Sequence, residues 1–246
     1  HYSAYHKQIF MIQNRPNFLN SIPPVTKNLI IINLLLWLAT IVFRKTLGID
    51  LVEYLGLHYF QADRFNAAQM VTYMFMHDPY SFGHVFFNMF SVFIFGRTLE
   101  SVWGGKRFLV FYMITGIGAG LIQEITWYIS LHDAIANTES MIGWSQTRLV
   151  LNNIITIGAS GAVFGILLAF GMMFPNAELF LMFIPIPIKA KYFVIGYGLI
   201  ELFLGIRSSS GGGDNIAHFA HLGGMLFGLI LILYWRKKGG GNHGYF

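Results

Sequence analysis

The chain contains no cysteine, which excludes disulfides, thiolate nucleophiles and thiolate metal sites. Charge is also scarce, because Asp, Glu, Lys and Arg make up only 11% of the residues, whereas a soluble domain carries roughly 25%. Hydrophobic residues account for 55%, and the mean hydropathy is +0.56. The net charge of +5 does not indicate a nucleic-acid partner, since the basic residues flank apolar segments. The composition therefore predicts a membrane protein with no separate soluble domain.

Six apolar segments lie between charged or turn-rich flanks, at about residues 29–43, 83–95, 108–129, 154–174, 192–206 and 215–235. Several are shorter than the ~20 residues with which a helix crosses a bilayer, so flanking residues and snorkelling Lys or Arg must extend them. A seventh stretch, residues 67–76, is too short to span and is expected in a partly embedded loop. The pattern predicts an all-α, polytopic membrane protein with six transmembrane helices.

The Lys and Arg residues are distributed unequally between the two sides of the membrane that these segments imply. With the N-terminus in the cytoplasm, eleven of them lie on the cytoplasmic side and five on the other, in agreement with the positive-inside rule. Both ends of the chain are then expected in the cytoplasm, and for a bacterial protein the expected location is the plasma or inner membrane. The second, fourth and sixth segments all run inward from the outer face, so the depths of their residues can be compared.

These three segments carry polar residues at similar depth. Counted back from the residues that mark the cytoplasmic ends (Pro175, Arg236 and Arg97), Ser160 and His221 each lie 15 residues away and His84 lies 13. At about 1.5 Å per residue, this is roughly 20 to 23 Å above the inner edge of a core about 30 Å thick, and Asn88 is one turn deeper. A lone serine beside glycines most often serves close packing, and a lone histidine can be a satisfied structural group. The common depth instead favours one polar site below the outer surface.

Glycines on the fourth and sixth segments are spaced for close helix packing. Each segment has a small-xxx-small stripe, formed by Gly161 with Gly165 and by Gly224 with Gly228. If the two stripes pack together, Ser160 and His221 come within hydrogen-bond reach, as a serine nucleophile and its base require. The same spacing is common in membrane helices of any function, so it supports the site only together with the depth.

The stretch before the serine also suits the stabilisation of an oxyanion. Gly158 favours an irregular entry to the helix, which places Ser160 in the first turn, where backbone N–H groups have no intrahelical partners. These donors and the positive end of the helix dipole favour a tetrahedral oxyanion. His84 and Asn88, which share one helix face, can add side-chain donors.

Two alternatives concern the groups around this site. No carboxylate is expected to complete a triad, because Asp214 belongs to a glycine-rich loop and Glu201 to a fifth segment that runs in the opposite direction, so a dyad is predicted. A metal site formed by His84, His218 and His221 is less favoured, because H-x-x-H lacks the glutamate and the spacing of H-E-x-x-H.

A different class of membrane protein, a small transporter, would show inverted repeats, and the sequence shows no repeat.

Four ordered motifs resemble those of the rhomboid intramembrane serine proteases: "GASG", "AHLGGMLFG", "HVFFN" and "GRTLESVWG". The resemblance implies that Ser160 is the nucleophile and His221 the base. It further implies that His84 and Asn88 stabilise the oxyanion together with the Ser160 N–H, and that Glu100 belongs to a structural motif. Phe164 stands where several relatives carry a tyrosine that stacks on the histidine. The residues expected to support the site by packing are Gly158, Gly161, Phe164, Gly165, Gly224 and Gly228.

The resemblance covers a six-helix domain at about residues 26–238, between a cytoplasmic segment (1–25) and a tail (239–246). It implies cleavage of single-pass or other transmembrane proteins in or near their membrane segments, in the lipid bilayer, with neither metal nor cofactor. The active site is expected to open toward the outer face. The alternative is a non-catalytic rhomboid-like protein that binds membrane clients, although such relatives usually lack the serine or the histidine.

Overall fold

A computed structural model of the protein describes residues 21–181, 184–209 and 218–238. Its helices are α2 (Pro24–Leu47), α3 (Val52–Leu55), α4 (Gln69–Thr72), α5 (Phe82–Ser91), α6 (Arg97–Trp103), α7 (Gly105–Ile142), α8 (Trp144–Leu151), α9 (Ser160–Met173), α10 (Ala190–Ser209) and α11 (His218–Lys238). A 3₁₀ turn, η2 (Tyr73–Phe75), precedes α5, and a π-helical turn, η3 (Val92–Gly96), joins α5 to α6. The predicted tail and most of the predicted N-terminal segment lie outside the described residues.

In the part of the chain that the structure describes, four short strands form two antiparallel pairs. β1 (Leu57–His58) pairs with β2 (Ile155–Thr156), and β3 (Glu178–Leu181) pairs with β4 (Ile184–Lys189). The first pair joins the loop after α2 to the segment that leads into α9. The second pair connects α9 to α10.

The helices confirm an all-α membrane protein. Within the described residues, four helical stretches are long and apolar enough to cross a membrane, namely α2, the continuous 82–103 stretch, α7 and α11. α9 is a shorter apolar helix of 14 residues, and α10 has 20 residues. Each predicted apolar segment thus overlaps one of these helical stretches, while the crossing of the membrane six times remains a prediction.

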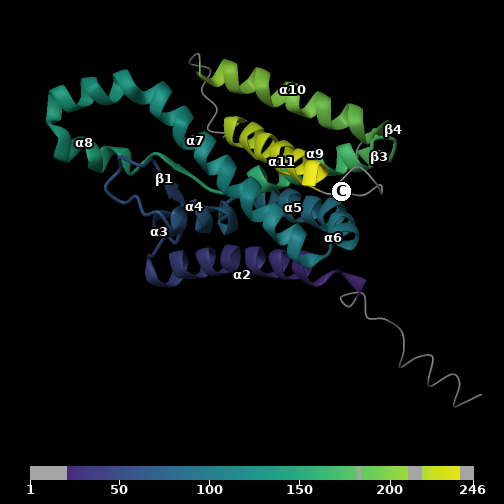
Figure 1. Cartoon of the computed structure of the whole chain (residues 1–246). Helices are drawn as coiled ribbons and strands as arrows, with labels where there is room; N and C mark the ends of the chain where they lie inside the picture. Colours follow the sequence, from purple (N-terminus) through teal and green to yellow (C-terminus); the bar gives the residue numbers. More distant parts are fainter. Residues whose placement is uncertain (1–20, 182–183, 210–217, 239–246) are drawn as a thin grey trace, which may run out of the picture.

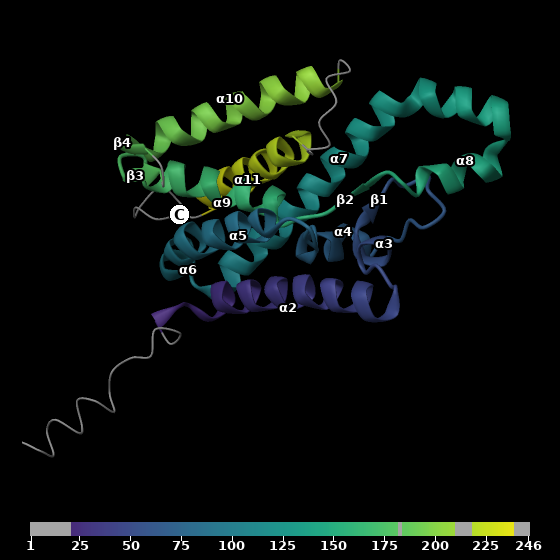
Figure 2. The same ribbon diagram turned by 180° about the vertical axis from the view of Figure 1, so that it is seen from behind.

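α2 and α10 lie on opposite sides of the bundle, with α9 and α11 between them (Figures 1 and 2). Both outer helices expose large apolar side chains, which include Leu35, Leu38 and Val42 on α2 and Ile195, Leu199 and Phe203 on α10. Exposed apolar side chains in such numbers are unfavourable in water but suit contact with lipid tails. The outer surface of the bundle therefore agrees with an environment of lipid.

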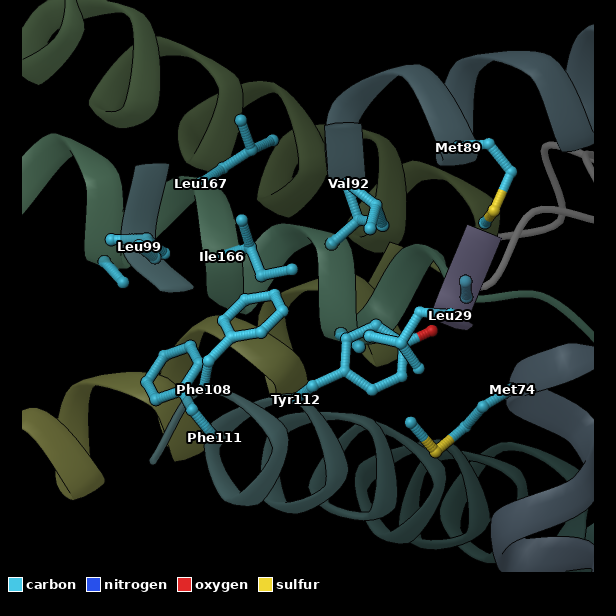
Figure 3. Close-up of a cluster of buried hydrophobic side chains, with 14 of the residues drawn as sticks. Leu29, Met74, Met89, Val92, Leu99, Phe108, Phe111, Tyr112, Ile166 and Leu167 are labelled. Atoms are coloured by element: carbon cyan, nitrogen blue, oxygen red, sulfur yellow. The ribbon is translucent and has the colours of Figure 1, made fainter. Parts of the chain in front are cut away.

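α9 occupies the centre of the bundle. Ten of its 14 residues are buried, and it packs against α7, α10 and α11. Figure 3 shows Ile166 of α9 directed toward the ring of Phe108 on α7, with Val92 of η3 nearby. A helix that is apolar on every face is stable only when neighbours surround it, so the other helices hold α9 in place.

Glu100 joins the start of α2 to α6. Its carboxylate accepts hydrogen bonds from the Val25 N–H (2.9 Å), the Thr26 N–H (2.6 Å) and the Thr26 hydroxyl (2.7 Å). The first N–H groups of a helix have no intrahelical acceptor, so a buried carboxylate at this place satisfies two of them. This geometry agrees with the structural role expected of Glu100.

Two predicted segments have the wrong bounds. The fourth was expected from residue 154, but α9 begins at Ser160, because Ile155 and Thr156 form β2 and pair with β1. The third was expected to end near residue 129, but α7 continues to Ile142, since residues 121–142 contain neither glycine nor proline. Gly143, with φ of 78°, then ends the helix.

Candidate active site

The backbone before α9 makes a sharp, left-handed turn at Gly158, whose φ is 128°. Its N–H donates to the Tyr73 carbonyl oxygen at 2.9 Å, so η2 holds the turn in place. A Cβ at Gly158 would lie 2.9 Å from His84 Nε2, and only glycine fits both this φ and this space. The turn allows α9 to begin at Ser160, where the first N–H groups have no intrahelical acceptor.

The serine and the histidine meet at this point. His221 Nε2 lies 2.8 Å from Ser160 Oγ, and His221 belongs to the first turn of α11. Its ring stacks on Phe164 of α9, with centroids 4.3 Å apart and planes 5° from parallel. Phe164 stacks in turn on Tyr197 of α10 at 5.3 Å. Three helices thus fix the orientation of the imidazole.

The glycine stripes allow this approach. A Cβ at Gly224 would overlap the Gly161 carbonyl oxygen, and one at Gly228 would lie 3.4 Å from the Gly165 Cα. The two stripes therefore lie against each other, as their spacing predicts. Gly161 and Gly165 also contact α7, where an added Cβ would meet Ala119 and Thr115. α7 is a third member of the packing, which the sequence did not indicate.

A carboxylate lies beside the imidazole, so the prediction that none is available was wrong. Glu201 Oε2 is 2.9 Å from His221 Nδ1 and 2.7 Å from His218 Nδ1. The opposite direction of α10 does not exclude this contact, because an antiparallel helix passes through every depth that its neighbours do. Counting residues from the cytoplasmic end of α10 to Glu201, as was done for Ser160 and His221, places the carboxylate near the middle of the membrane.

His84 and Asn88 lie on α5 below the turn. The Asp78 N–H donates to His84 Nδ1 at 3.3 Å, which assigns the ring proton to Nε2, the nitrogen that faces Gly158. Asn88 Nδ2 donates to the His84 carbonyl oxygen at 2.8 Å, and its second N–H is a further donor. The structure therefore brings His84 to the turn before Ser160, while it commits one amide hydrogen of Asn88 to its own helix.

His77 is a further histidine beside His84, and it was not predicted from the sequence. It is fully buried, and its ring centroid lies 5.0 Å from that of His84. Burial, and secondarily the nearby His84, lower the pKa of His77 to about 3, so the ring is neutral at physiological pH. The signal available in the sequence was the pair of histidines that bracket "HDPYSFGH".

One group within the described residues has the composition of a metal site. Ligand atoms of Glu201, His218 and His221 lie within 4.8 Å of one another. The metal site considered from the sequence contained His84 in place of Glu201. In the structure the carboxylate is at hydrogen-bond distance from both imidazoles, which satisfies its Oε2 without a metal ion.

The fold and the site together define the class of the protein. It is an intramembrane helical protein in which a serine at the start of the central helix contacts a histidine of a neighbouring helix. Comparison with known proteins identifies the family within that class. The Rhomboid domain model matches residues 64–238, and the chain belongs to the rhomboid family.

The relatives come from mitochondria, chloroplasts and bacteria. The chain is 27% identical over 160 residues to "Rhomboid protein 1, mitochondrial" of Saccharomyces cerevisiae, covering 63% of this chain and 39% of that protein. It is 29% identical over 162 residues to "Rhomboid protease AarA" of Providencia stuartii (61% and 50%) and 26% identical over 209 residues to "Rhomboid-like protein 11, chloroplastic" of Arabidopsis thaliana (77% and 63%). The matched regions thus span 39 to 63% of the length of these relatives.

Proposed function

We propose that the protein is an intramembrane serine endopeptidase that cleaves membrane-anchored proteins in or near their transmembrane segments. The observation that carries this proposal is the 2.8 Å contact between Ser160 Oγ and His221 Nε2. A serine hydroxyl is a weak nucleophile until a neighbouring base takes its proton, and this distance is within the range that general-base catalysis requires. The relationship to a bacterial protein named as a rhomboid protease supports the same activity.

The proposed reaction proceeds by acyl transfer. Ser160 Oγ attacks the substrate carbonyl carbon while its proton passes to His221 Nε2. The tetrahedral intermediate collapses as the C–N bond breaks, and His221 returns the proton to the leaving amine. A water molecule then attacks the ester carbonyl, with His221 again as the base, and releases the carboxylate product and the free serine.

The oxyanion of the intermediate is assigned to the start of α9. The Ser160 N–H is one of the first donors of a helix and lies at the positive end of its dipole. His84 Nε2, which carries the ring proton and faces Gly158, is a second donor, and the remaining Asn88 N–H is a third. Removing one oxyanion donor costs about 10² to 10³ in rate in other serine proteases.

The substrate is proposed to be a single-pass or other transmembrane protein that enters from the bilayer. A helical peptide bond is protected by its own hydrogen bonds, which have no replacement in lipid. Cleavage therefore requires local unwinding and favours helix-breaking residues near the cleaved bond. The charge distribution supports cytoplasmic chain ends and a site that opens toward the outer face.

The activity is tested on the purified protein in detergent with a fluorophosphonate probe, which reacts with activated serines. We expect labelling of the wild type, no labelling of Ser160→Ala, and a loss of about 10²-fold or more in the labelling rate of His221→Ala. Ser101→Ala, an exposed serine on α6, is the matched control and should label normally. The same panel should cleave, or fail to cleave, a single-span substrate in proteoliposomes.

Two results would contradict the proposal. Labelling that persists in Ser160→Ala would reject Ser160 as the nucleophile. A correctly folded wild type that neither labels nor cleaves would instead favour a rhomboid-like protein that binds membrane clients without cutting them.

A further inference from the structure

Glu201 is the only carboxylate among the described residues at hydrogen-bond distance from the imidazole that contacts Ser160. Its side chain is 9% exposed, and the proposed mechanism above makes no use of it. Burial of a carboxylate is costly unless hydrogen bonds or opposite charge compensate for it. Both compensating partners of Oε2 are histidines of α11, so the carboxylate is oriented toward the site and not toward the packing of α10.

The geometry fixes the position of the ring proton on His221. An ionised carboxylate can only accept hydrogen bonds, so at 2.9 Å from Glu201 the His221 Nδ1 must be the donor. In a neutral imidazole Nε2 then has a free lone pair. This is the nitrogen that lies 2.8 Å from Ser160 Oγ, and only this tautomer can accept the serine proton.

We propose that Glu201 is a positioning residue that completes a Ser160–His221–Glu201 triad, so that the site is more than a dyad. The inference rests on the proposed function. Glu201 holds the tautomer and the ring orientation of His221, and its negative charge stabilises the imidazolium that forms when the serine proton is transferred. Throughout the reaction Glu201 remains ionised, because the transferred proton stays on Nε2 until it passes to the leaving amine.

His218 acts on Glu201 and not on the serine. Its Nδ1 lies 2.7 Å from the same Oε2, so the two imidazoles hold the carboxylate from one side. The side chain of His218 is 3% exposed, and its ring centroid lies 6.4 Å from that of His221. The role of His218 is therefore to keep the carboxylate aimed at the imidazole.

Few other titratable groups face this imidazole from the neighbouring helices. In the described residues they are His218 on α11, His84 on α5 and, one ring further away, Tyr197 on α10, which stacks on Phe164. From α7, Ala119 and Ile122 pack against Gly223 in the first turns of α11, and neither of them titrates. Among these described groups, Glu201 is thus the only acid that can compensate for a positive charge on His221, and in a site of low dielectric this compensation is strong.

The test compares Glu201→Gln with Glu100→Gln. Both replace a buried carboxylate by its isosteric amide, but Glu100 bonds to the start of α2, away from the site. In Glu201→Gln the new amide can donate to His221 Nδ1 and thereby move the ring proton to Nε2, the wrong tautomer. We expect the fluorophosphonate labelling rate per folded molecule to fall on the order of 10²-fold in Glu201→Gln, at every pH where the wild type labels, and to be unchanged in Glu100→Gln.

A second measurement does not depend on activity or on the folding of a variant. In ¹⁵N-histidine-labelled wild-type protein, NMR should show His221 protonated at Nδ1 and unprotonated at Nε2. A proton at Nε2 would overturn the proposal, as would an equal labelling rate per folded molecule in Glu201→Gln. Should the wild type not label at all, the proposed function fails while the NMR result still decides the contact between Glu201 and His221.

Discussion

At the scale of single residues, the site depends on a missing side chain. Gly158 turns the backbone with a positive φ of 128°, and His84 Nε2 occupies the space where a Cβ would be. The turn brings a proton donor of α5 beside the first residue of α9. Any substituent at residue 158 therefore changes the place where the oxyanion is expected to form.

We predict that Gly158→Ala lowers the labelling rate about 10²-fold, the effect of losing one oxyanion donor, because the new methyl group displaces the His84 ring. Backbone strain should also reduce stability by about 1 to 3 kcal/mol. Gly143→Ala is the matched control, since its φ is 78° but no atom lies within 4 Å of the added Cβ. This control should lose stability and label normally, and equal labelling of both variants would refute the prediction.

Single residues also show where sequence reasoning failed. Ser160 and His221 could be paired from their depth in the membrane and from the glycine spacing, because both are counted directly along the sequence. Glu201 and His77 could not, because their roles depend on the rotation of α10 about its axis and on the path of the chain before α5. Neither quantity leaves a periodic signal in an apolar sequence.

At the scale of elements, the contact between α9 and α11 brings the serine and the histidine together. The backbone of Gly224 touches that of Gly161, and α7 closes the other side of α9. Backbones at this distance leave no room for a methyl group. The height of His221 relative to Ser160 is therefore set by the glycines and not by the polar residues themselves.

We predict that Gly224→Ala separates the two helices and lowers stability by about 1 to 3 kcal/mol. The labelling rate should fall by more than the loss of folded protein explains. Gly196→Ala on α10, where no atom lies within 4 Å of the added Cβ, should label normally and gain up to about 1 kcal/mol of stability, because alanine is the better helix former. Thermal denaturation measures the change in stability, and the fluorophosphonate labelling rate per folded molecule measures the change in activity. Normal labelling in Gly224→Ala would show that the close contact is not needed.

The existence of most helices could be predicted from apolar segments, but their ends could not. α7 extends beyond its apolar part because its later residues still favour a helix, and α9 starts late because β2 pairs with β1. Hydrophobicity reports the contact with lipid or core, whereas a helix ends where the backbone finds another hydrogen-bond partner or a glycine turn.

At the scale of the whole molecule, buried histidines make stability dependent on pH. In the unfolded chain His77 titrates at its usual pKa of 6.5, whereas burial lowers its pKa in the folded protein to about 3. Between these values the unfolded state binds more protons. The contribution of His77 to stability is therefore complete above pH 6.5 and is lost progressively as the pH falls toward 3.

We predict that wild-type stability declines between pH 6.5 and 5, with His77 contributing up to about 1.4 kcal/mol per pH unit. His77→Leu should reduce this slope without abolishing it, because burial also lowers the pKa of His58. His132→Leu, an exposed position on α7, is the control and should keep the wild-type slope. Denaturation in detergent at a series of pH values provides the measurement, and identical slopes in all three proteins would contradict the assignment.

The central place of α9 has a consequence for the synthesis of the chain. The serine leaves the ribosome well before α11, yet its helix is shorter than a bilayer and is surrounded only when α11 has arrived. A nascent chain thus carries the nucleophile without its base or its outer wall. In the proposed enzyme, the insertion of α11 therefore switches the site on, so a chain that has not yet inserted α11 cannot cut the proteins that pass beside it.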